Sequence, residues 1–462
     1  MNAIGVYQLG QDVPGGRELS ENVFRYYVND NHPPFYFILL GLWLNLFGMT
    51  EFSARMLSVL INLITLPVVY LLAWQIFKDR KVSLVACLIF GFSPYLVYFS
   101  QEARMYSLLL LLSSLSMLFF LKIQERADWR SYAAFVLFSI LGIYTHYYYV
   151  FLFCFQIFYW IFFGDDRVHE FLLSLSIIVL CFIPWIPVLL YQIAQKNQSD
   201  LWIRNNARGG TVLWQGIANS LTILFRFAAG ESYAYPSSTW GLRVMCWVVG
   251  VLFIVILLQR PFLLRQRHGR MLTLWLLFPL MSGLAADVFF RTKTLEISKY
   301  FIVSYPAMLL ILGVSVVRFR WKYCIPILLA ALVILNAKAL GQYYETPKAV
   351  EWRDVARYLS STVGTDDAVL STDAKVSNCI GFYLEKRLNI IEVPYGSTID
   401  YILKSARKNV ASSQKLWMVS VYEPYTPKLQ DLSQRMEQNF PLLSQHVVAE
   451  HAIVRSFARP KD

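Results

Sequence analysis

The sequence has few charged residues for its length. Only 16% of its 462 residues are Asp, Glu, Lys or Arg, whereas 56% are hydrophobic, and its mean hydropathy is +0.45. A soluble chain of this size needs a larger polar fraction to cover its surface. The composition therefore excludes a water-soluble protein and predicts a membrane protein with several spans.

Patterns typical of metal, nucleotide or nucleic-acid proteins are also missing. Five of the six cysteines lie in apolar runs and only Cys379 lies in the polar C-terminal part, which argues against disulfides and thiolate metal sites. That part contains no glycine-rich dinucleotide fingerprint. Basic cytoplasmic loops and anionic lipid explain the net charge of +12, and without a nucleic-acid motif we expect no nucleic-acid partner.

The N-terminal residues lack the basic segment and apolar segment of a signal peptide. His32-Pro33-Pro34 follows them and predicts the sharp start of a helix over 35–47, because proline disfavours helical backbone before it and suits the first turn after it. With about 13 residues this helix is short for a span and fits an interfacial or re-entrant helix. We expect residues 1–53 to form an extracytoplasmic loop with interfacial helices.

Long apolar runs, by contrast, are abundant. Ten are long enough to cross a bilayer as helices, and they indicate a mainly α, polytopic bundle over residues 54–340. Aromatic residues make up 16% of the chain and suit two membrane interfaces. The predicted spans are 54–77, 82–99, 107–121, 131–145, 147–163, 171–191, 240–258, 271–290, 300–317 and 321–340.

The loops between these spans differ in basic charge. Loops 78–81, 122–130, 164–170, 259–270 and 318–322 hold 14 Lys or Arg in 37 residues, and the opposite set, 100–106, 146, 192–239 and 291–299, holds 8 in 65. Lys and Arg concentrate in cytoplasmic loops. The first set is therefore predicted to be cytoplasmic, which places the opposite loops and the tail outside the cytoplasm, in an inner or plasma membrane protein.

The composition changes after Tyr343. Thr346-Pro347 predicts a helix start, and strand-like runs then alternate with helical stretches. This alternation predicts a small extracytoplasmic α/β domain over residues 345–462. The predicted strands are 368–371, 389–393, 416–421 and 447–456, and the predicted helices lie near 375–386, 398–408 and 426–438.

A short polar stretch, residues 100–106, separates two apolar runs. It contains Glu102 and Arg104, and charged groups at a span's edge are costly unless they meet water, partners or a ligand. One interpretation is a solvated turn with a weak ion pair. The other is a functional site, supported by Tyr95, Tyr98, Glu102 and Tyr106, which recur at helical spacing and predict one face.

Four further residues on the same side have both a functional and a structural interpretation. His32 is a surface histidine, a head-group contact or a metal ligand. His146 lies in a tyrosine-rich segment, where the first interpretation is anchoring at the membrane interface. Arg55 and Lys299 lie at the starts of spans on the predicted non-cytoplasmic side, where the positive-inside rule disfavours Lys and Arg. Their side chains either reach to the membrane interface or bind a lipid phosphate. No span carries the repeated charges of a proton relay, which disfavours transport.

Several of these segments together resemble one enzyme family. The similarity is to the family 39 glycosyltransferases, membrane enzymes of the GT-C type related to the protein O-mannosyltransferases and the lipid A aminoarabinose transferase. It covers about residues 29–340. The segments that carry it are His32-Pro33-Pro34-Phe35-Tyr36, Phe52-Ser53-Ala54-Arg55, the run from Ser93 to Tyr106, Tyr144-Thr145-His146-Tyr147 and, more weakly, Lys299-Tyr300 with Pro306.

The resemblance implies transfer of a sugar from a polyprenyl phosphate carrier at the non-cytoplasmic face, with inversion at the anomeric carbon. Such enzymes usually begin with a span ending in an Asp-Glu pair, whose aspartate is taken as catalytic. No such pair occurs in residues 1–31, where Asp30 is the nearest carboxylate to His32. We therefore expect that the complete protein has a further N-terminal span carrying this aspartate.

The site that follows from the residues and the resemblance has two parts. Sugar transfer to a hydroxyl needs a general base and a cation for the leaving phosphate. The expected catalytic residues are Glu102, His32 and Asp30. The expected substrate-binding residues are Arg104, Tyr106, Arg55, His146, Lys299, Tyr98 and Gln101. No metal ligands are expected, and the sequence leaves the participation of a divalent metal ion open.

The sequence thus predicts a glycosyltransferase that moves a hexose or pentose, such as mannose, from a polyprenyl phosphate carrier to a glycan, lipid or protein acceptor in contact with membrane lipids. Two alternatives stay open at this stage. One is a non-catalytic protein that binds or transports lipid-linked sugars, and the other is an inactive truncated homologue.

Overall fold

The computed structural model describes residues 32–48, 50–126, 128–164, 166–199, 212–231, 250, 266–290, 292–318, 323–345, 352–372, 374–384, 388–391, 393, 397–410, 415–421, 423, 427–449 and 452–458. These residues fall into two compact units, one within residues 23–342 and one within residues 343–462. The predicted span 240–258 apart from residue 250, the helix start at 346–347 and Asp30 lie outside the described residues.

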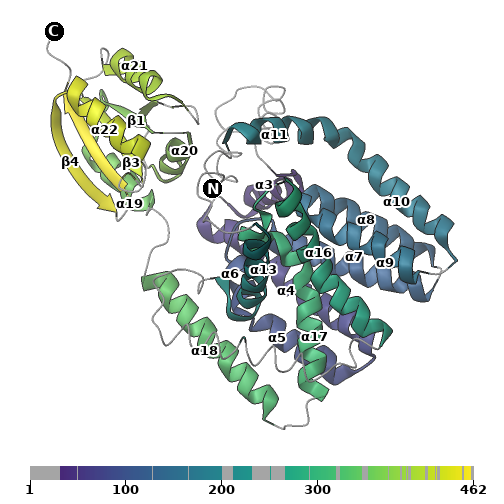
Figure 1. Ribbon diagram of the computed structural model, residues 1–462. Helices are drawn as coiled ribbons and strands as arrows, with labels where there is room; N and C mark the ends of the chain where they lie inside the picture. Colours follow the sequence, from purple (N-terminus) through teal and green to yellow (C-terminus); the bar gives the residue numbers. More distant parts are fainter. Residues whose placement is uncertain are drawn as a thin grey trace. The chain divides into compact units, whose positions relative to one another are not determined.

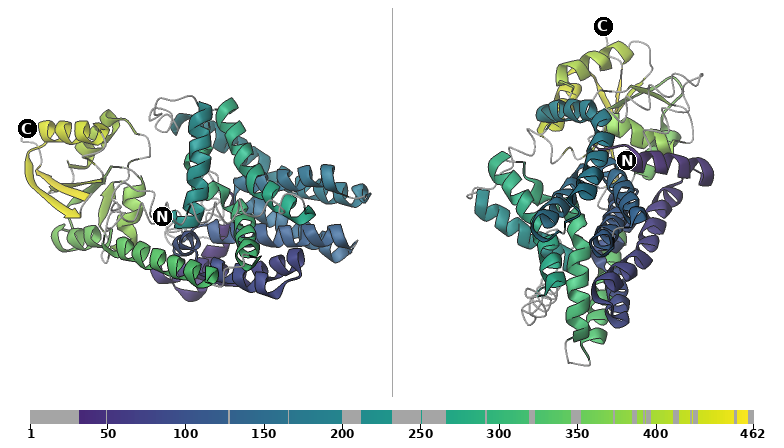
Figure 2. Two further views of the ribbon diagram at one scale, coloured as in Figure 1. Left: turned by 60° about the horizontal axis from the view of Figure 1, so that its bottom comes forward. Right: turned by 90° about the vertical axis from the view of Figure 1, so that its right-hand side faces the viewer.

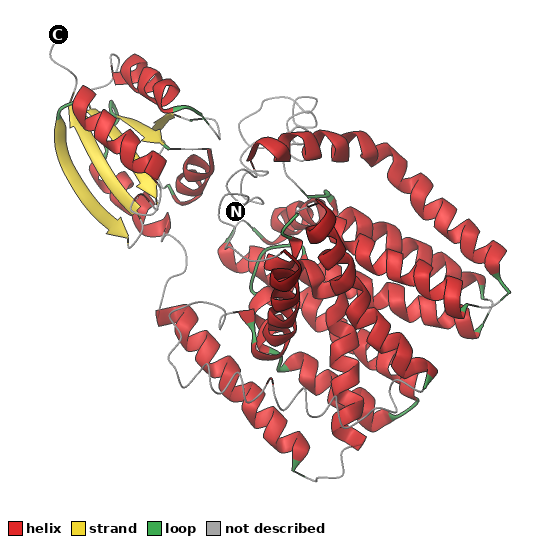
Figure 3. Ribbon diagram, in the orientation of Figure 1, coloured by secondary structure: helices red, strands yellow, loops and turns green. Residues whose placement is uncertain are grey.

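The described secondary structure of the first unit consists of helices joined by short loops (Figures 1 and 3). Its α-helices are α3 (Phe35–Phe47), α4 (Glu51–Phe77), α5 (Arg80–Gly91), α6 (Pro94–Ser100), α7 (Tyr106–Glu125), α8 (Trp129–Thr145), α9 (Val150–Phe163), α10 (Val168–Phe182), α11 (Ile186–Ser199), α13 (Val212–Ala229), α16 (Arg267–Phe290), α17 (Tyr305–Arg318) and α18 (Cys324–Glu345). Short 3₁₀ helices are η1 (Tyr147–Tyr149), η2 (Ile183–Trp185), η4 (Thr294–Glu296) and η5 (Ser298–Ser304).

Nine of the ten predicted spans coincide with described helices, and the predicted short helix at 35–47 is α3. By length and composition, five described helical segments can cross a membrane, or six if the bent pair α5 and α6 counts as one span. Only 11% of the apolar window in Val168–Ala194 is buried. Such an apolar outer surface is stable only in lipid, so the unit is an integral membrane bundle.

The bundle is built from neighbouring helices that pack pairwise. Helix α4 contacts α5 and α7, α7 contacts α8, and α8 contacts α10 (Figures 1 and 2). Helices α16 and α17 pack against each other, and α17 also contacts α5. Helix α7 is 83% buried over its most apolar window and the segment formed by η5 and α17 is 89% buried, so both lie inside the described bundle.

The span predicted at 82–99 is not one straight helix. Helices α5 and α6 meet at 56°, with Phe92 and Ser93 between them. Pro94 cannot donate a backbone hydrogen bond, and the Ser93 side chain caps the new helix by accepting from Leu96 N at 3.3 Å. The Tyr305 hydroxyl lies 2.6 Å from Ser93 Oγ and ties this break to α17.

The second unit is a small α/β domain. Its helices are α19 (Trp352–Thr362), α20 (Ala374–Tyr383), α21 (Ile399–Val410) and α22 (Pro427–Asn439). Its strands are β1 (Ala368–Ser371), β2 (Asn389–Ile391), β3 (Lys415–Val421), β4 (Leu442–Ala449) and β5 (Ala452–Ala458), in the order β2-β1-β3-β5-β4. The first three strands are parallel, and β5 is antiparallel to both β3 and β4.

The strand predicted at 447–456 was wrong, because that run spans the end of β4 and most of β5 in one hairpin. The run of strand-forming residues is continuous in sequence and does not show where the chain reverses direction between β4 and β5.

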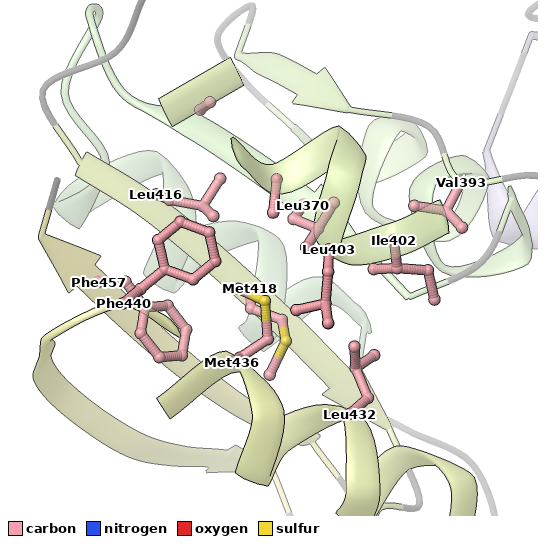
Figure 4. Packing of buried hydrophobic residues seen from close by; sticks show 12 residues of the cluster. Leu370, Val393, Ile402, Leu403, Leu416, Met418, Leu432, Met436, Phe440 and Phe457 are labelled. Atoms are coloured by element: carbon pink, nitrogen blue, oxygen red, sulfur yellow. The ribbon is translucent and has the colours of Figure 1, made fainter. Parts of the chain in front are cut away.

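The sheet buries apolar side chains on both faces. One cluster, shown in Figure 4, joins Leu416, Met418 and Phe457 to Leu403 of α21 and Met436 of α22. The other packs β-strand residues such as Val369 against Val355 of α19.

A buried ion pair lies within this sheet. Arg455 of β5 donates two hydrogen bonds to Glu423, at 2.6 and 2.9 Å, and both side chains are less than a tenth exposed. Burial alone would raise the pKa of Glu423, but the hydrogen bonds from Arg455 and Ser420 hold that pKa below its ordinary value. A carboxyl group with a lowered pKa stabilises the fold at neutral pH and loses this contribution as pH falls below about 4.5.

Glu423→Gln is therefore expected to destabilise the α/β domain by about 3 kcal/mol at neutral pH, because the buried charge of Arg455 loses its two short bonds to a carboxylate and keeps only the 3.4 Å ion pair with the part-exposed Glu437. Hydrogen exchange of the β3 and β5 amides in the detergent-solubilised chain measures this. As the pH falls below about 4.5, the variant should lose less stability than the parent, because it has no carboxyl group to protonate at this position. Asp431→Asn, which removes an exposed pair with Arg435, is the control and should leave exchange unchanged. Equal effects of the two changes would contradict the account.

Candidate functional site

The polar stretch between α6 and α7 is a tight turn. Helix α6 ends at Ser100, α7 begins at Tyr106, and the Arg104 amide donates to the Glu102 carbonyl at 2.8 Å. The prediction that Tyr95, Tyr98, Glu102 and Tyr106 share one helical face is therefore wrong. Tyr95 belongs to the core and stacks on Tyr305, with ring centroids 5.4 Å apart.

This turn is attached to the neighbouring helices by a buried polar chain. The Tyr36 hydroxyl of α3 lies 2.9 Å from Ser58 Oγ of α4, and Ser58 Oγ donates to the Arg104 carbonyl at 3.4 Å. A buried carbonyl outside a helix needs such a partner. These bonds join helix α3 to the turn that contains Glu102, although the two segments are distant in sequence.

His146 lies at a second helix interruption, between α8 and η1. Its Nδ1 accepts a hydrogen bond from Tyr148 N at 3.1 Å and caps η1. The next tyrosine fixes the segment, because the Tyr149 hydroxyl lies 2.7 Å from Ser116 Oγ in α7. The Tyr149 ring packs so closely on Gly142 that a Cβ there would come within 2.4 Å of it. The position of His146 is therefore set by packing around Tyr149.

His146 is surrounded by aromatic rings, which we call the aromatic cluster: His32, Tyr106, His146, Tyr148 and Tyr300. The His146 ring centroid lies 5.6 Å from that of His32, 6.0 Å from Tyr106, 5.4 Å from Tyr148 and 5.7 Å from Tyr300. Tyr148 and Tyr300 stack at 4.1 Å. Four separate segments of the chain thus meet here, and His146, only 2% exposed, lies among them.

Lys299 extends the site with a cation. Its Nζ lies 5.1 Å from the centroid of the Tyr106 ring, in the range of a cation–π contact. It also interacts electrostatically with Arg104 and Glu102. The short loop that ends in Lys299 and the polar stretch at 100–106, nearly two hundred residues apart in sequence, thus form one charged group of side chains.

The segment that carries Lys299 is held by a carboxylate that sequence reasoning missed. Glu231 accepts from Ser298 Oγ at 2.6 Å and forms a 3.0 Å ion pair with Arg226 of α13. Gly230, at φ +99°, precedes it and lies against Pro94 of α6. Gly230 could have indicated the end of α13 from sequence, since glycine favours positive φ where a helix ends. Nothing in the sequence, however, connects residue 231 with residue 298.

Asp287, which the sequence showed only as a carboxylate in an apolar run, holds the preceding loop. It is 6% exposed and accepts from Thr294 N at 2.6 Å, Leu295 N at 3.0 Å and Thr292 Oγ1 at 2.6 Å. These bonds satisfy backbone donors at the start of η4. Asp287 is therefore a structural residue of the loop that leads to Lys299.

The structure brings together most of the predicted site residues. His32, Glu102, Arg104, Tyr106, His146 and Lys299 are linked by the contacts described above. Gln101 lies in the same turn, and its amide donates to the Tyr98 carbonyl at 3.2 Å, while the Tyr98 ring packs on Phe99. Arg55 is exposed near the start of α4, one turn before Ser58.

Two buried polar atoms of the site have no hydrogen-bond partner among the described residues. They are Glu102 Oε2 and His146 Nε2. Leaving such atoms unsatisfied costs about 1–3 kcal/mol each, so both atoms are candidates for ligand contacts. In the described part of the chain, His, Cys, Asp and Glu side chains form no group of three or more that could hold a metal ion.

Comparison with known proteins supports a glycosyltransferase fold. Residues 31–191 match the family model described as dolichyl-phosphate-mannose-protein mannosyltransferase. ArnT from Cupriavidus metallidurans, solved bound to undecaprenyl phosphate, is similar over 92% of this chain and 88% of its own, with TM-score 0.56 and 13% identity. No curated protein sequence matches the chain.

A second solved structure is the archaeal oligosaccharyltransferase AglB from Archaeoglobus fulgidus, in complex with an inhibitory peptide and a dolichol-phosphate. It is similar over 94% of this chain and 66% of its own, with TM-score 0.51 and 12% identity. The predicted resemblance is confirmed: residues 31–191 match the model of the dolichyl-phosphate-mannose-protein mannosyltransferase family, and the chain has the fold of the GT-C membrane glycosyltransferases.

Proposed function

We propose that the chain is a glycosyltransferase that moves a sugar from a polyprenyl phosphate carrier to an acceptor hydroxyl at the non-cytoplasmic face. The observation that carries the proposal is the group formed by Lys299, Arg104 and Glu102 beside the aromatic cluster, at helix interruptions of a membrane bundle. Charged groups in such a place mark ligand sites more often than structural ones. The matched family and the fold supply the reaction class.

Lys299 and Arg104 are suited to the phosphate of the carrier. Charge-assisted hydrogen bonds from ammonium and guanidinium groups are the strongest that proteins make to phosphate. The phosphate gains negative charge as it leaves the sugar, so cations at fixed positions stabilise the transition state more than the ground state. The polyprenyl chain would extend into the lipid that surrounds the apolar bundle.

Glu102 is suited to the acceptor. Of the three described carboxylates around this site that are not exposed, Asp287 accepts from backbone donors, Glu231 binds Arg226 and Ser298, and Glu102 keeps a buried oxygen without a partner among the described residues. In the proposed step the acceptor oxygen forms a bond to the anomeric carbon. The carbon–oxygen bond to the phosphate breaks and leaves its electrons on the phosphate, and the acceptor proton passes to Glu102.

The side of the membrane follows from the loop charges. The turn with Glu102, His146 and the Lys299 loop all belong to the set of loops with fewer Lys and Arg, which the positive-inside rule assigns to the non-cytoplasmic side. The acceptor, whether a glycan, a lipid or a protein, would be met there. The residues described provide the cations and the carboxylate for this step, and no step is assigned to a metal ion.

Glu102→Gln is expected to lower the rate of sugar release about 100-fold or more, with carrier affinity changed by less than about threefold, because it removes the proton acceptor but keeps the shape. Reconstituted protein is given undecaprenyl phosphate linked to mannose, glucose, galactose or arabinose, and release of undecaprenyl phosphate is measured. Glu296→Gln, an exposed carboxylate of the Lys299 loop, is the control. Binding of these carriers by the parent protein without turnover would instead indicate a lipid-linked-sugar binding protein.

Glu231→Gln is expected to weaken undecaprenyl phosphate binding about three- to tenfold, because it loosens the Ser298 contact that positions Lys299. Lys299→Ala is expected to weaken binding about tenfold or more. If Glu231 acts through Lys299, its substitution should have almost no further effect in the Lys299→Ala background. The four affinities are measured on the solubilised chain. Losses that multiply in the double variant would show that Glu231 does not act through Lys299.

A further inference from the structure

His146 presents one hydrogen-bonding atom that no other described residue uses. The side chain is 2% exposed, and its Nε2 has no partner among the described residues. An imidazole needed only to anchor the chain at a membrane interface would have its polar end in water. Here the polar end is enclosed by rings of the aromatic cluster, so a ligand is the natural partner for it.

The backbone determines which nitrogen carries the hydrogen. Nδ1 accepts the Tyr148 amide hydrogen at 3.1 Å, so Nδ1 has no hydrogen of its own. The neutral imidazole then carries its single hydrogen on Nε2. His146 therefore presents a donor, and an oxygen lone pair is the group that fits it.

The surroundings keep the ring uncharged. Burial lowers the pKa of His146 well below its ordinary value, and the nearby His32, Lys299 and Arg104 act in the same direction. The other titratable side chains in contact with the ring are those of Tyr106, Tyr148 and Tyr300. The donor is thus present across the physiological pH range while the cations are supplied by Lys299 and Arg104.

We propose that His146 is the neutral hydrogen-bond donor of the carrier subsite, giving its Nε2–H to an oxygen of the polyprenyl phosphate-linked sugar. This inference rests on the proposed function and deepens it. The accepting oxygen belongs either to the phosphate or to the sugar, since both offer lone pairs. In this arrangement the bound group meets the Tyr148–Tyr300 stack and Tyr106, and Lys299, whose Nζ lies 5.1 Å from the centroid of the Tyr106 ring, meets the phosphate charge.

Two substitutions separate this role from the structural role of His146 as a helix cap. Asn carries a carbonyl oxygen near the position of Nδ1 and is a good N-cap, so His146→Asn keeps the bond from Tyr148 N but removes the Nε2 donor. Gln is one methylene longer and brings an amide N–H near the position of Nε2, so His146→Gln keeps the donor and weakens the cap. If His146 binds the ligand, Asn should therefore impair binding more than Gln. If His146 acts only as a helix cap, Gln should be the more harmful substitution.

The experiment measures the affinity of the full solubilised chain for undecaprenyl phosphate and for its mannosyl derivative, together with thermal stability. His146→Asn should keep the parent's thermal stability and bind at least one ligand about five- to tenfold more weakly, whereas His146→Gln should bind within about twofold of the parent. A loss already present with undecaprenyl phosphate assigns the oxygen to the phosphate. A loss confined to the mannosyl carrier assigns it to the sugar.

The proposal is overturned if Asn binds both ligands like the parent, or if Gln and Asn are equally damaging. A parent protein that binds neither ligand contradicts the proposed function itself, which distinguishes that failure from a failure of the His146 assignment. His146→Phe serves as a third variant, because it fills the ring volume without any donor and should bind no better than Asn.

Discussion

The candidate site depends on one constraint: backbone polar groups buried among apolar helices must find partners within the protein. Helices meet this need along their length, but the chain interrupts its helices at Ser93, at residues 101–105, at His146 and before η5. Each interruption exposes backbone groups, and each is closed by a side chain. Ser93 caps α6, Ser58 binds the Arg104 carbonyl, His146 caps η1, and Asp287 holds η4. The site is the place where these interruptions meet.

This arrangement gives rigidity to residues that would otherwise be loop residues. Tyr149 and Gly142 fix His146, Ser58 fixes the Glu102 turn, and Glu231 fixes the start of η5. Cations at fixed positions need no reorganisation when charge develops on a leaving phosphate, which is the main electrostatic advantage of an enzyme over water. Two of the buried atoms without partners among the described residues, Glu102 Oε2 and His146 Nε2, are an acceptor and a donor. A sugar-phosphate ligand offers the complementary groups to both.

Much of this was predictable from sequence, for reasons that are local. Apolar runs reveal membrane helices because a helix that crosses lipid must be apolar along its whole length. His32-Pro33-Pro34 predicts the start of α3 because proline restricts the backbone of the residue before it. The α/β alternation of the tail follows from side-chain periodicity, although the β4–β5 hairpin was read as one strand. The GT-C resemblance was carried by short segments around Glu102, Arg55 and His146, and it is confirmed by the fold.

What sequence could not supply is proximity between distant segments. The helical-face prediction for Tyr95 to Tyr106 failed because a tight turn at 101–105 breaks the period, and Glu231 went unnoticed because its partner Ser298 lies 67 residues away.

The most direct test of the account is a cryo-electron microscopy structure of the chain with undecaprenyl phosphate. The account predicts that the phosphate contacts Lys299 and Arg104 beside the aromatic cluster. A phosphate bound away from these residues would contradict it.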